Sequence, residues 1–106
     1  VAWHHGNSFF QTQKVGTKAR NRLDIYDLSG NVQEWCWDWM NYAVGVTAAT
    51  PADGAAYSGT SPLANQKPFN GGGVGSNITY SCVAYSWGSA PDHKDSYVGF
   101  RVVRKP

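Results

Sequence analysis

The sequence predicts an α+β domain that is irregular and rich in loops, with short strands. Three observations support this class. Helix signals are scarce, and the best candidate, residues 41–47, is short and contains Gly45. Strand signals are short and separated from one another. Residues 48–70 are rich in Ala, Gly, Ser, Thr and Pro, lack both the helical and the strand period, and are therefore expected to form a long surface loop.

Length and composition limit the kinds of protein to which the chain can belong. A chain of 106 residues is one domain at most, with a modest core. The formal net charge of +2 favours neither nucleic acid nor an anionic membrane as a partner. No apolar run approaches the roughly 20 residues of a membrane span. The chain opens on "VAWHHGNSFF", without an initiator Met or a charged leader, so we expect it to be a fragment or a processed product.

Three segments have the residue types of strands. "NVQEWCWDW" alternates, which would place Trp35, Trp37 and Trp39 on one face and two carboxylates on the other. "ITYSCVAYS", residues 78–86, mixes β-branched and aromatic residues. "YVGFRVVR", residues 97–104, is apolar and is expected to pair centrally in the sheet. The glycine cluster "FNGGGVGSN", ahead of the second segment, permits positive φ angles or a close backbone approach.

The turn "DLSGNVQE" offers oxygen ligands for a hard cation. Calcium takes several oxygens, from carboxylates and backbone carbonyls together. Such a shell would be formed by Asp27, the carbonyls of Gly30 and Val32, and Glu34. The alternative interpretation is that Asp27 only starts a turn and that Glu34 pairs with an arginine.

The two cysteines, Cys36 and Cys82, do not form a C-x-x-C motif. This spacing argues against a zinc knuckle or a thioredoxin-like site. A disulfide and two buried thiols are both compatible with the sequence, because a sequence does not give the separation of the two residues. The sequence therefore leaves open whether the two cysteines form a disulfide.

The second half of the chain has the composition of a binding surface. No P-loop, G-x-G-x-x-G or G-x-S-x-G motif is present. Aromatic and small polar residues are interspersed, a mixture in which Tyr and Trp supply contact area at low entropy cost while the small residues adapt. The alternative for each aromatic is a place in the core. The predicted ligand-binding residues are Ser76, Asn77, Tyr80, Tyr85, Trp87, Ser89, His93, Asp95 and Tyr97.

Several of these segments resemble the formylglycine-generating enzyme (sulfatase-modifying factor) domain. "NRLDIYDLSGNVQEWCWDW" is similar to the N-x-L-G-L-Y-D-M-S-G-N-V-W-E-W signature of that family, and "VAWHHGNSFFQTQKVGTK" to the segment before it. "FNGGGVGSN", "SCVAYS" and "YVGFRVVR" occupy the places of its R-G-G-S-W, C-R-x-A-x-R and closing G-F-R stretches. The resemblance implies a C-type lectin-like fold with short antiparallel strands, of which residues 1–106 would be the C-terminal portion of a single domain. It also implies a structural calcium ion on Asp27, Gly30, Val32 and Glu34.

Departures from the family pattern bear on function. The oxidase members carry two cysteines at places that hold Gly72 and Asn77 here, so thiolate catalysis is not expected. The chain is more similar to the variable proteins of diversity-generating retroelements, which keep this scaffold while side chains on one exposed face, here within residues 71–97, are rewritten.

This resemblance implies a protein without catalytic residues that binds an unknown ligand, a protein rather than nucleic acid. It also implies a location at the cell surface, in the medium or on a phage. The alternatives are an enzyme or degenerate enzyme of the formylglycine-generating family, and a structural module that binds nothing. For the structural module, no cluster of surface aromatics is expected.

Overall fold

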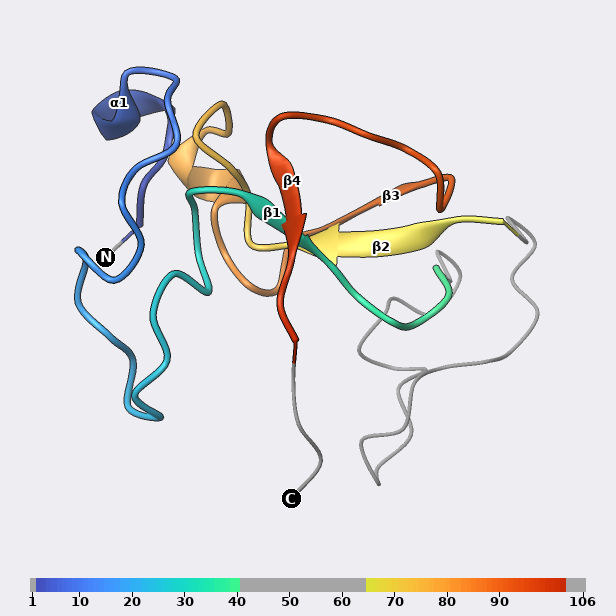
Figure 1. Cartoon of the computed structure of the whole chain (residues 1–106), viewed down its shortest axis with the longest axis horizontal. Coiled ribbons are helices and arrows are strands. Elements are labelled where there is room, and N and C mark those ends of the chain that lie inside the picture. The colour runs from blue at the N-terminus through green and yellow to red at the C-terminus, as the bar shows by residue number, and fades with distance from the viewer. Residues whose placement is uncertain (1, 41–64, 103–106) are drawn as a thin grey trace.

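The computed structural model describes residues 2–40 and 65–102. Figure 1 shows the strands gathered at the centre and a short helix at one end. This part of the chain is a small mixed sheet with few helices, so the predicted α+β class is confirmed. No helix among these residues has the length and hydropathy to cross a bilayer. In chain order the elements are α1 (His5–Ser8), β1 (Gln33–Trp35), β2 (Lys67–Asn70), the 3₁₀ turn η1 (Ile78–Tyr80), β3 (Ser86–Ser89) and β4 (Val98–Phe100).

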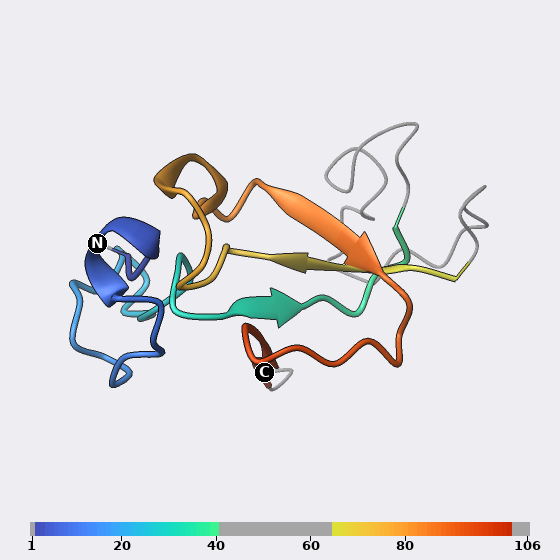
Figure 2. The ribbon, with the colours of Figure 1, turned by 90° about the horizontal axis from the view of Figure 1, so that it is seen from above.

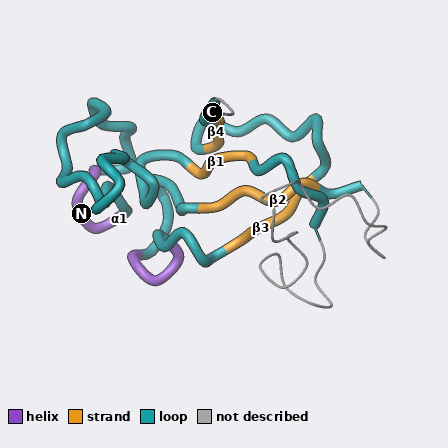
Figure 3. The backbone as a smooth tube through the Cα atoms, turned by 90° about the horizontal axis from the view of Figure 1, so that it is seen from below, coloured by secondary structure: helices purple, strands orange, loops and turns teal. Residues whose placement is uncertain are grey.

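The sheet has the order β3-β2-β1-β4, which can be followed in Figure 3. β1 pairs antiparallel with β2, and β2 with β3, whereas β4 runs parallel to β1 with Gly99 opposite Glu34. Two expectations are therefore wrong: the strands are not all antiparallel, and the closing strand lies at an edge of the sheet that residues 2–40 and 65–102 form. The reason is the connection of residues 90–97, which returns along the sheet (Figure 2). β4 then enters beside β1 in the same direction, where Gln33 N donates to Tyr97 O at 2.7 Å.

The segment 78–86, predicted as a strand, is a short helical turn followed by a reverse turn. Asn77 begins it, since its Oδ1 accepts a hydrogen bond from Thr79 N at 3.1 Å and its carbonyl accepts one from Tyr80 N at 2.9 Å. Asparagine favours turns because its side chain bonds to the backbone two residues on. Extended backbone resumes only at Ser86, so the strand prediction is wrong for residues 78–85.

β2 lies at the end of residues 48–70, which the composition predicts to be a long loop. Proline cannot donate to a sheet ladder and is uncommon inside sheets. Pro68 is accommodated because its carbonyl makes the ladder contact, accepting from Cys36 N at 2.8 Å, while its ring is fully buried. The loop prediction is therefore wrong for residues 67–70. Residues 48–64 and the helix predicted over 41–47 lie outside the described residues, as does the end of the closing strand.

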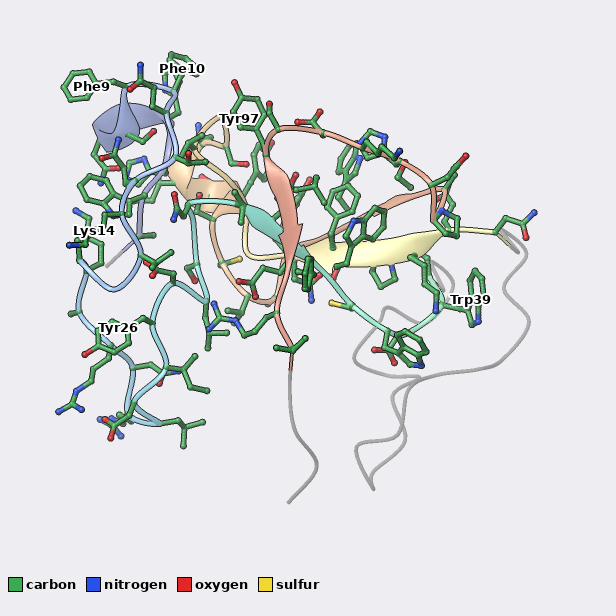
Figure 4. All side chains as sticks on the ribbon, viewed as in Figure 1. Phe9, Phe10, Lys14, Tyr26, Trp39 and Tyr97 are labelled. Atoms are coloured by element: carbon green, nitrogen blue, oxygen red, sulfur yellow. The ribbon has the colours of Figure 1, made fainter. Side chains whose placement is uncertain are left out.

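β1 ends at Trp35, so the three tryptophans do not share one strand face. Trp35 packs edge-on against Phe69, with ring centroids 5.0 Å apart. Trp37 is 83% exposed. The Lys67 ammonium lies 4.0 Å from the centroid of the Trp39 ring and donates a hydrogen bond to the Trp37 carbonyl. Figure 4 places Trp39 at the end of the sheet that is remote from α1.

The glycine cluster adopts the conformations expected of it. Gly71 and Gly72 have φ angles of 91° and 64°. A Cβ on Gly72 would stand 2.6 Å from the Tyr80 carbonyl oxygen, so the chain passes η1 at a distance that only glycine allows. Gly30 N donates to Gly71 O at 2.6 Å, which ties the turn before β1 to this cluster. The cluster thus fixes the position of η1 relative to the sheet.

The core of the described part is small. Its buried apolar side chains are Met40, Pro68, Phe69 and Val74. The Ser8 hydroxyl is fully buried and donates to the Val74 carbonyl at 3.1 Å, which anchors α1 to the segment after the glycines. Phe69, at the centre of the sheet, belongs to this core and also lines a surface cavity.

Candidate ligand-binding site

One cavity, here called the ligand cavity, gathers most of the predicted ligand-binding residues. Its volume is about 430 Å³, within the range of small-molecule pockets. It lies between η1, β3 and the start of β4, where Figure 4 labels Tyr97. Seven of the nine predicted residues line it: Ser76, Tyr80, Tyr85, Trp87, His93, Asp95 and Tyr97.

Three of these residues, Tyr80, Tyr85 and Trp87, form an aromatic wall. The ring centroids of Tyr80 and Tyr85 are 4.7 Å apart, and those of Tyr85 and Trp87 are 6.4 Å apart with the planes inclined by 23°. η1 holds Tyr80, β3 holds Trp87, and a turn closed by Tyr85 N donating to Cys82 O holds Tyr85. Trp87 is 56% exposed and Tyr80 is 47% exposed. The wall therefore faces solvent and is not part of the core.

The floor of the ligand cavity contains residues that the sequence did not indicate: Gln33, Phe69 and Val98. Phe69 stacks with His93, with ring centroids 6.3 Å apart and planes inclined by 16°. Gln33 shares a face of β1 with Trp35, because side chains alternate along a strand. That alternation was an available signal for Gln33. Phe69 and Val98 carry no local signal, since their positions depend on strands that pair across long separations.

Asp95 and Tyr97 form the rim. Asp95 Oδ1 accepts a hydrogen bond from Tyr97 N at 2.9 Å. The Tyr97 side chain lies against the glycine cluster, where a Cβ on Gly73 would be 3.4 Å from Tyr97 Cβ. Ser76 Oγ accepts from Gly73 N at 3.0 Å. Within the described part of the lining, Asp95 is the single carboxylate, and no lysine or arginine is present. No described basic side chain of the lining therefore neutralises the Asp95 carboxylate.

The two remaining predicted residues lie outside the ligand cavity. The Asn77 side chain accepts from Thr79 N and Thr79 Oγ1, and so begins η1. Ser89 ends β3, opposite Lys67 of β2. Asn77 thus supports the segment that carries the aromatic wall, and Ser89 supports the pairing of the strand.

A second cavity, the turn cavity, has a volume of about 300 Å³. Asp27 Oδ2 accepts a hydrogen bond from Gly16 N at 2.7 Å. Glu34 accepts a forked pair from Arg101, Nε to Oε2 at 2.9 Å and Nη2 to Oε1 at 2.8 Å. This arginine partner is what the alternative interpretation expected, and its hydrogen bond to Glu34 raises the pKa of Arg101. The turn cavity is lined by all four residues predicted to hold calcium: Asp27, Gly30, Val32 and Glu34.

The donor set of the turn cavity suits a hard cation in kind. Two carboxylates and two backbone carbonyls are ligands that calcium takes, within a shell of about six to eight oxygens. Both carboxylates already accept hydrogen bonds within the protein. Among the described residues, no three His, Cys, Asp or Glu side chains are grouped so as to hold a metal ion. A cation here would thus depend on the backbone carbonyls and on water as much as on Asp27 and Glu34.

The two cysteines are free thiols. Cys36 is half-buried and Cys82 is exposed. Burial raises the pKa of the Cys36 thiol, and the nearby carboxylates of Asp38 and Glu34 raise it further. A raised pKa leaves less thiolate at neutral pH, so Cys36 is a poor nucleophile.

Comparison with known proteins extends these observations. In the curated chaperone protein LppX of Paenibacillus barcinonensis, 36 residues are 53% identical to this chain, covering 34% of this chain and 13% of that protein. The structure of Treponema denticola variable protein 1 matches 93% of this chain with a TM-score of 0.72 and 29% identity. The structure of PvdO from Pseudomonas aeruginosa also matches 93%, with a TM-score of 0.77 and 26% identity.

This chain spans only 34% and 37% of the length of those two solved chains. The family profile of the sulfatase-modifying factor enzyme 1-like domain, in contrast, matches residues 2–106, nearly the whole sequence. The signature turn, the closing G-F-R and the structural likeness all agree with that match. The chain belongs to the family of sulfatase-modifying factor enzyme 1-like domains.

Proposed function

We propose that the chain is part of a ligand-binding protein that presents a diversified surface on a C-type lectin-like scaffold, as variable proteins of diversity-generating retroelements do. The observation that carries the proposal is the convergence of seven predicted residues on one solvent-facing cavity. A structural module that binds nothing is expected to lack such an aromatic cluster. The likeness to Treponema denticola variable protein 1 supports the same function.

The aromatic wall supports a protein ligand. Tyr and Trp are the residues that most often dominate binding energy, and truncating a central one typically costs about 2 kcal/mol or more. Trp87 is more than half exposed without a ligand, so a ligand would remove a large apolar area from water. A protein of this kind would act at the cell surface, in the medium or on a phage.

Peptides selected against the immobilised chain provide ligands for a test. A Trp87→Ala variant is expected to bind them at least about tenfold more weakly. Its melting temperature should change by less than about 2 °C, because substitution of exposed residues has little effect on stability. Trp37→Ala is the matched control, since Trp37 is 83% exposed and lies outside the ligand cavity. Equal losses in both variants would place binding elsewhere, and a large stability loss in Trp87→Ala would assign that ring to the core.

Diversification is tested at the gene. We expect a neighbouring reverse transcriptase gene and a near-copy of the segment that encodes residues 71–101, with differences concentrated at adenines. Sequencing the locus from several isolates measures this directly. A locus without either feature would contradict diversification, although ligand binding would still be decided by the Trp87→Ala experiment.

The second candidate is an enzyme or degenerate enzyme of the formylglycine-generating family, which the family match and the likeness to PvdO favour. The residues at the oxidase cysteine places argue against oxidase chemistry. Gly72 cannot accept a side chain without moving the backbone of η1, and Asn77 caps that turn. Copper-dependent turnover of a cysteine-containing peptide would establish the enzyme instead.

We further propose that calcium, when bound, occupies the turn cavity as a structural ion. Asp27, Glu34 and the carbonyls of Gly30 and Val32 would hold it there, with Arg101 remaining as a wall of the cavity. The convergence of these four residues on one cavity supports the proposal.

A further inference from the structure

The rings and the charge of the ligand cavity together indicate the chemistry of its ligand. We infer that the cavity receives an organic cation, the guanidinium of an arginine side chain presented by a protein ligand. The inference rests on the proposed ligand-binding function and specifies what is bound. It follows from the charge of the lining, from the geometry of the rings and from the placement of the chain's own cations.

The charge of the lining favours a cation. Among the described residues that line the cavity, Asp95 is the single carboxylate, and none is a lysine or an arginine. The hydrogen bond from Tyr97 N to Asp95 Oδ1 holds the carboxylate in place at the rim. A carboxylate has about four lone-pair sites, so Asp95 retains acceptor capacity toward a ligand. Asp95 is exposed and its pairing is screened by water, so contacts with the rings must supply much of the affinity.

The rings offer the faces that such a cation needs. Tyr85 and Trp87 are stacked, with planes inclined by 23°, and Tyr80 lies beside them. A cation is attracted to the face of Trp or Tyr within about 6 Å of the ring centroid. A guanidinium also stacks flat on such a ring while its N–H groups remain free to contact a carboxylate. The ammonium of lysine is attracted to the face of a ring but cannot stack flat on it, so arginine fits this lining better than lysine.

The chain's own lysines do not occupy these faces. Lys18 lies 3.8 Å from the ring centroid of Trp3, and Lys67 lies over Trp37 and Trp39. Across the described residues, these three are the tryptophan rings with a lysine or arginine over them, and the rings of the ligand cavity have none. The tryptophan in the ligand cavity is therefore open to a cation from outside.

The test uses pairs of pentapeptides that are identical except for the central residue. One carries arginine and the other citrulline, which has the same shape without the charge. Calorimetry on the whole chain is expected to show saturable binding of the arginine peptide and at least about fivefold weaker binding of the citrulline peptide. A lysine peptide should bind between these two. Free choline is added as a separate probe for a small ammonium ligand.

Asp95→Asn is the informative variant, because asparagine keeps the oxygen that accepts from Tyr97 N and removes only the charge. It should weaken binding of the arginine peptide, to an affinity between those of the arginine and citrulline peptides, because the contacts of the cation with the rings remain. Asp92→Asn is the matched control, since Asp92 is exposed in the same loop but does not line the cavity. It should leave binding unchanged.

Three results of the peptide measurements would overturn the inference. They are equal binding of the arginine and citrulline peptides, no binding of the arginine peptide at millimolar concentration, and no effect of Asp95→Asn. Choline binding as tight as the arginine peptide would also overturn it, by replacing the protein side chain with a small ammonium ligand. If arginine and citrulline bind equally but both depend on Trp87, the proposed ligand-binding site stands and only the cation is wrong. If selected peptides bind independently of Trp87, the proposed function fails as well.

Discussion

Two ion pairs in the described part of the chain differ in exposure. The side chains of Arg101 and Glu34 are 33% and 23% exposed, whereas those of Arg20 and Asp24 are 58% and 73% exposed. Arg101 makes a forked contact with both oxygens of Glu34, and charge-assisted pairs of this geometry are the stronger ones. Arg101 follows β4 and Glu34 lies in β1, so the pair fastens the edge strand to its neighbour.

Arg101→Gln is expected to lower the free energy of unfolding by about 1–2 kcal/mol, because the Glu34 carboxylate would lose its charged partner in a partly buried place. Urea unfolding measures this. Arg20→Gln removes the exposed pair and should cost less than about 0.5 kcal/mol. Equal costs for the two variants would mean that the Glu34–Arg101 pair is as solvated as the exposed one, despite its lower exposure.

Among the elements, the strands that the sequence predicted correctly are those with a local signal. Residues 33–35 alternate and residues 98–100 are apolar, and both segments are strands. β2 has no such signal, and its extended state comes from pairing with β1 and β3 on its two sides. Ile78–Tyr80 has the composition of a strand, yet the Asn77 cap turns it into η1. Composition predicted the secondary structure correctly where strand pairing agreed with it. The prediction failed where strand pairing or a helix cap determined the backbone conformation instead.

Gly72→Ala tests the close approach between the glycine cluster and η1. Gly72 and Gly16 both have positive φ, 64° and 71°, but a Cβ on Gly72 would meet backbone at 2.6 Å whereas one on Gly16 would meet nothing within 4 Å. Gly16→Ala should therefore cost only the left-handed conformation, about 1–2 kcal/mol. Gly72→Ala should cost about 1–3 kcal/mol more, because it also displaces backbone.

The measurement is chemical unfolding of both variants, with ligand binding of the folded protein as a second readout. The displaced backbone in Gly72→Ala belongs to Tyr80 and Ser81, so the aromatic wall should shift and the affinity for selected peptides should fall. Gly16→Ala should leave that affinity unchanged. Equal stabilities for the two variants would show that η1 moves away at no cost and that the glycine is not required there.

In the molecule as a whole, β1 separates two sites. Side chains alternate along a strand, so Gln33 lines the ligand cavity while its neighbour Glu34 lines the turn cavity. Much of the ligand cavity could be predicted, because the residues from Ser76 to Tyr97 that form its wall and rim share one segment with a marked composition. The floor could not, because Phe69 and Val98 reach it only through strand pairing. The two cavities share backbone but, among the described residues, no lining residue, which makes their proposed roles separable by experiment.

Calcium removal tests that separation. If calcium occupies the turn cavity, ligation to the folded state alone stabilises it by RT ln(1 + [L]/Kd), about 2.7 kcal/mol at a hundredfold excess over Kd. The melting temperature should then fall by at least about 5 °C between calcium and EDTA buffers. Asp27→Asn should abolish this shift, because it removes the charge of one carboxylate. Asparagine tolerates the positive φ of 55° at that position and keeps an oxygen for Gly16 N. Asp92→Asn should retain the shift.

Peptide affinity, measured well below both melting temperatures, should be the same in calcium and EDTA, because the ion would contact no residue of the ligand cavity. A melting temperature that EDTA leaves unmoved would mean that Arg101 and Gly16 N alone satisfy the two carboxylates, and that the turn needs no ion.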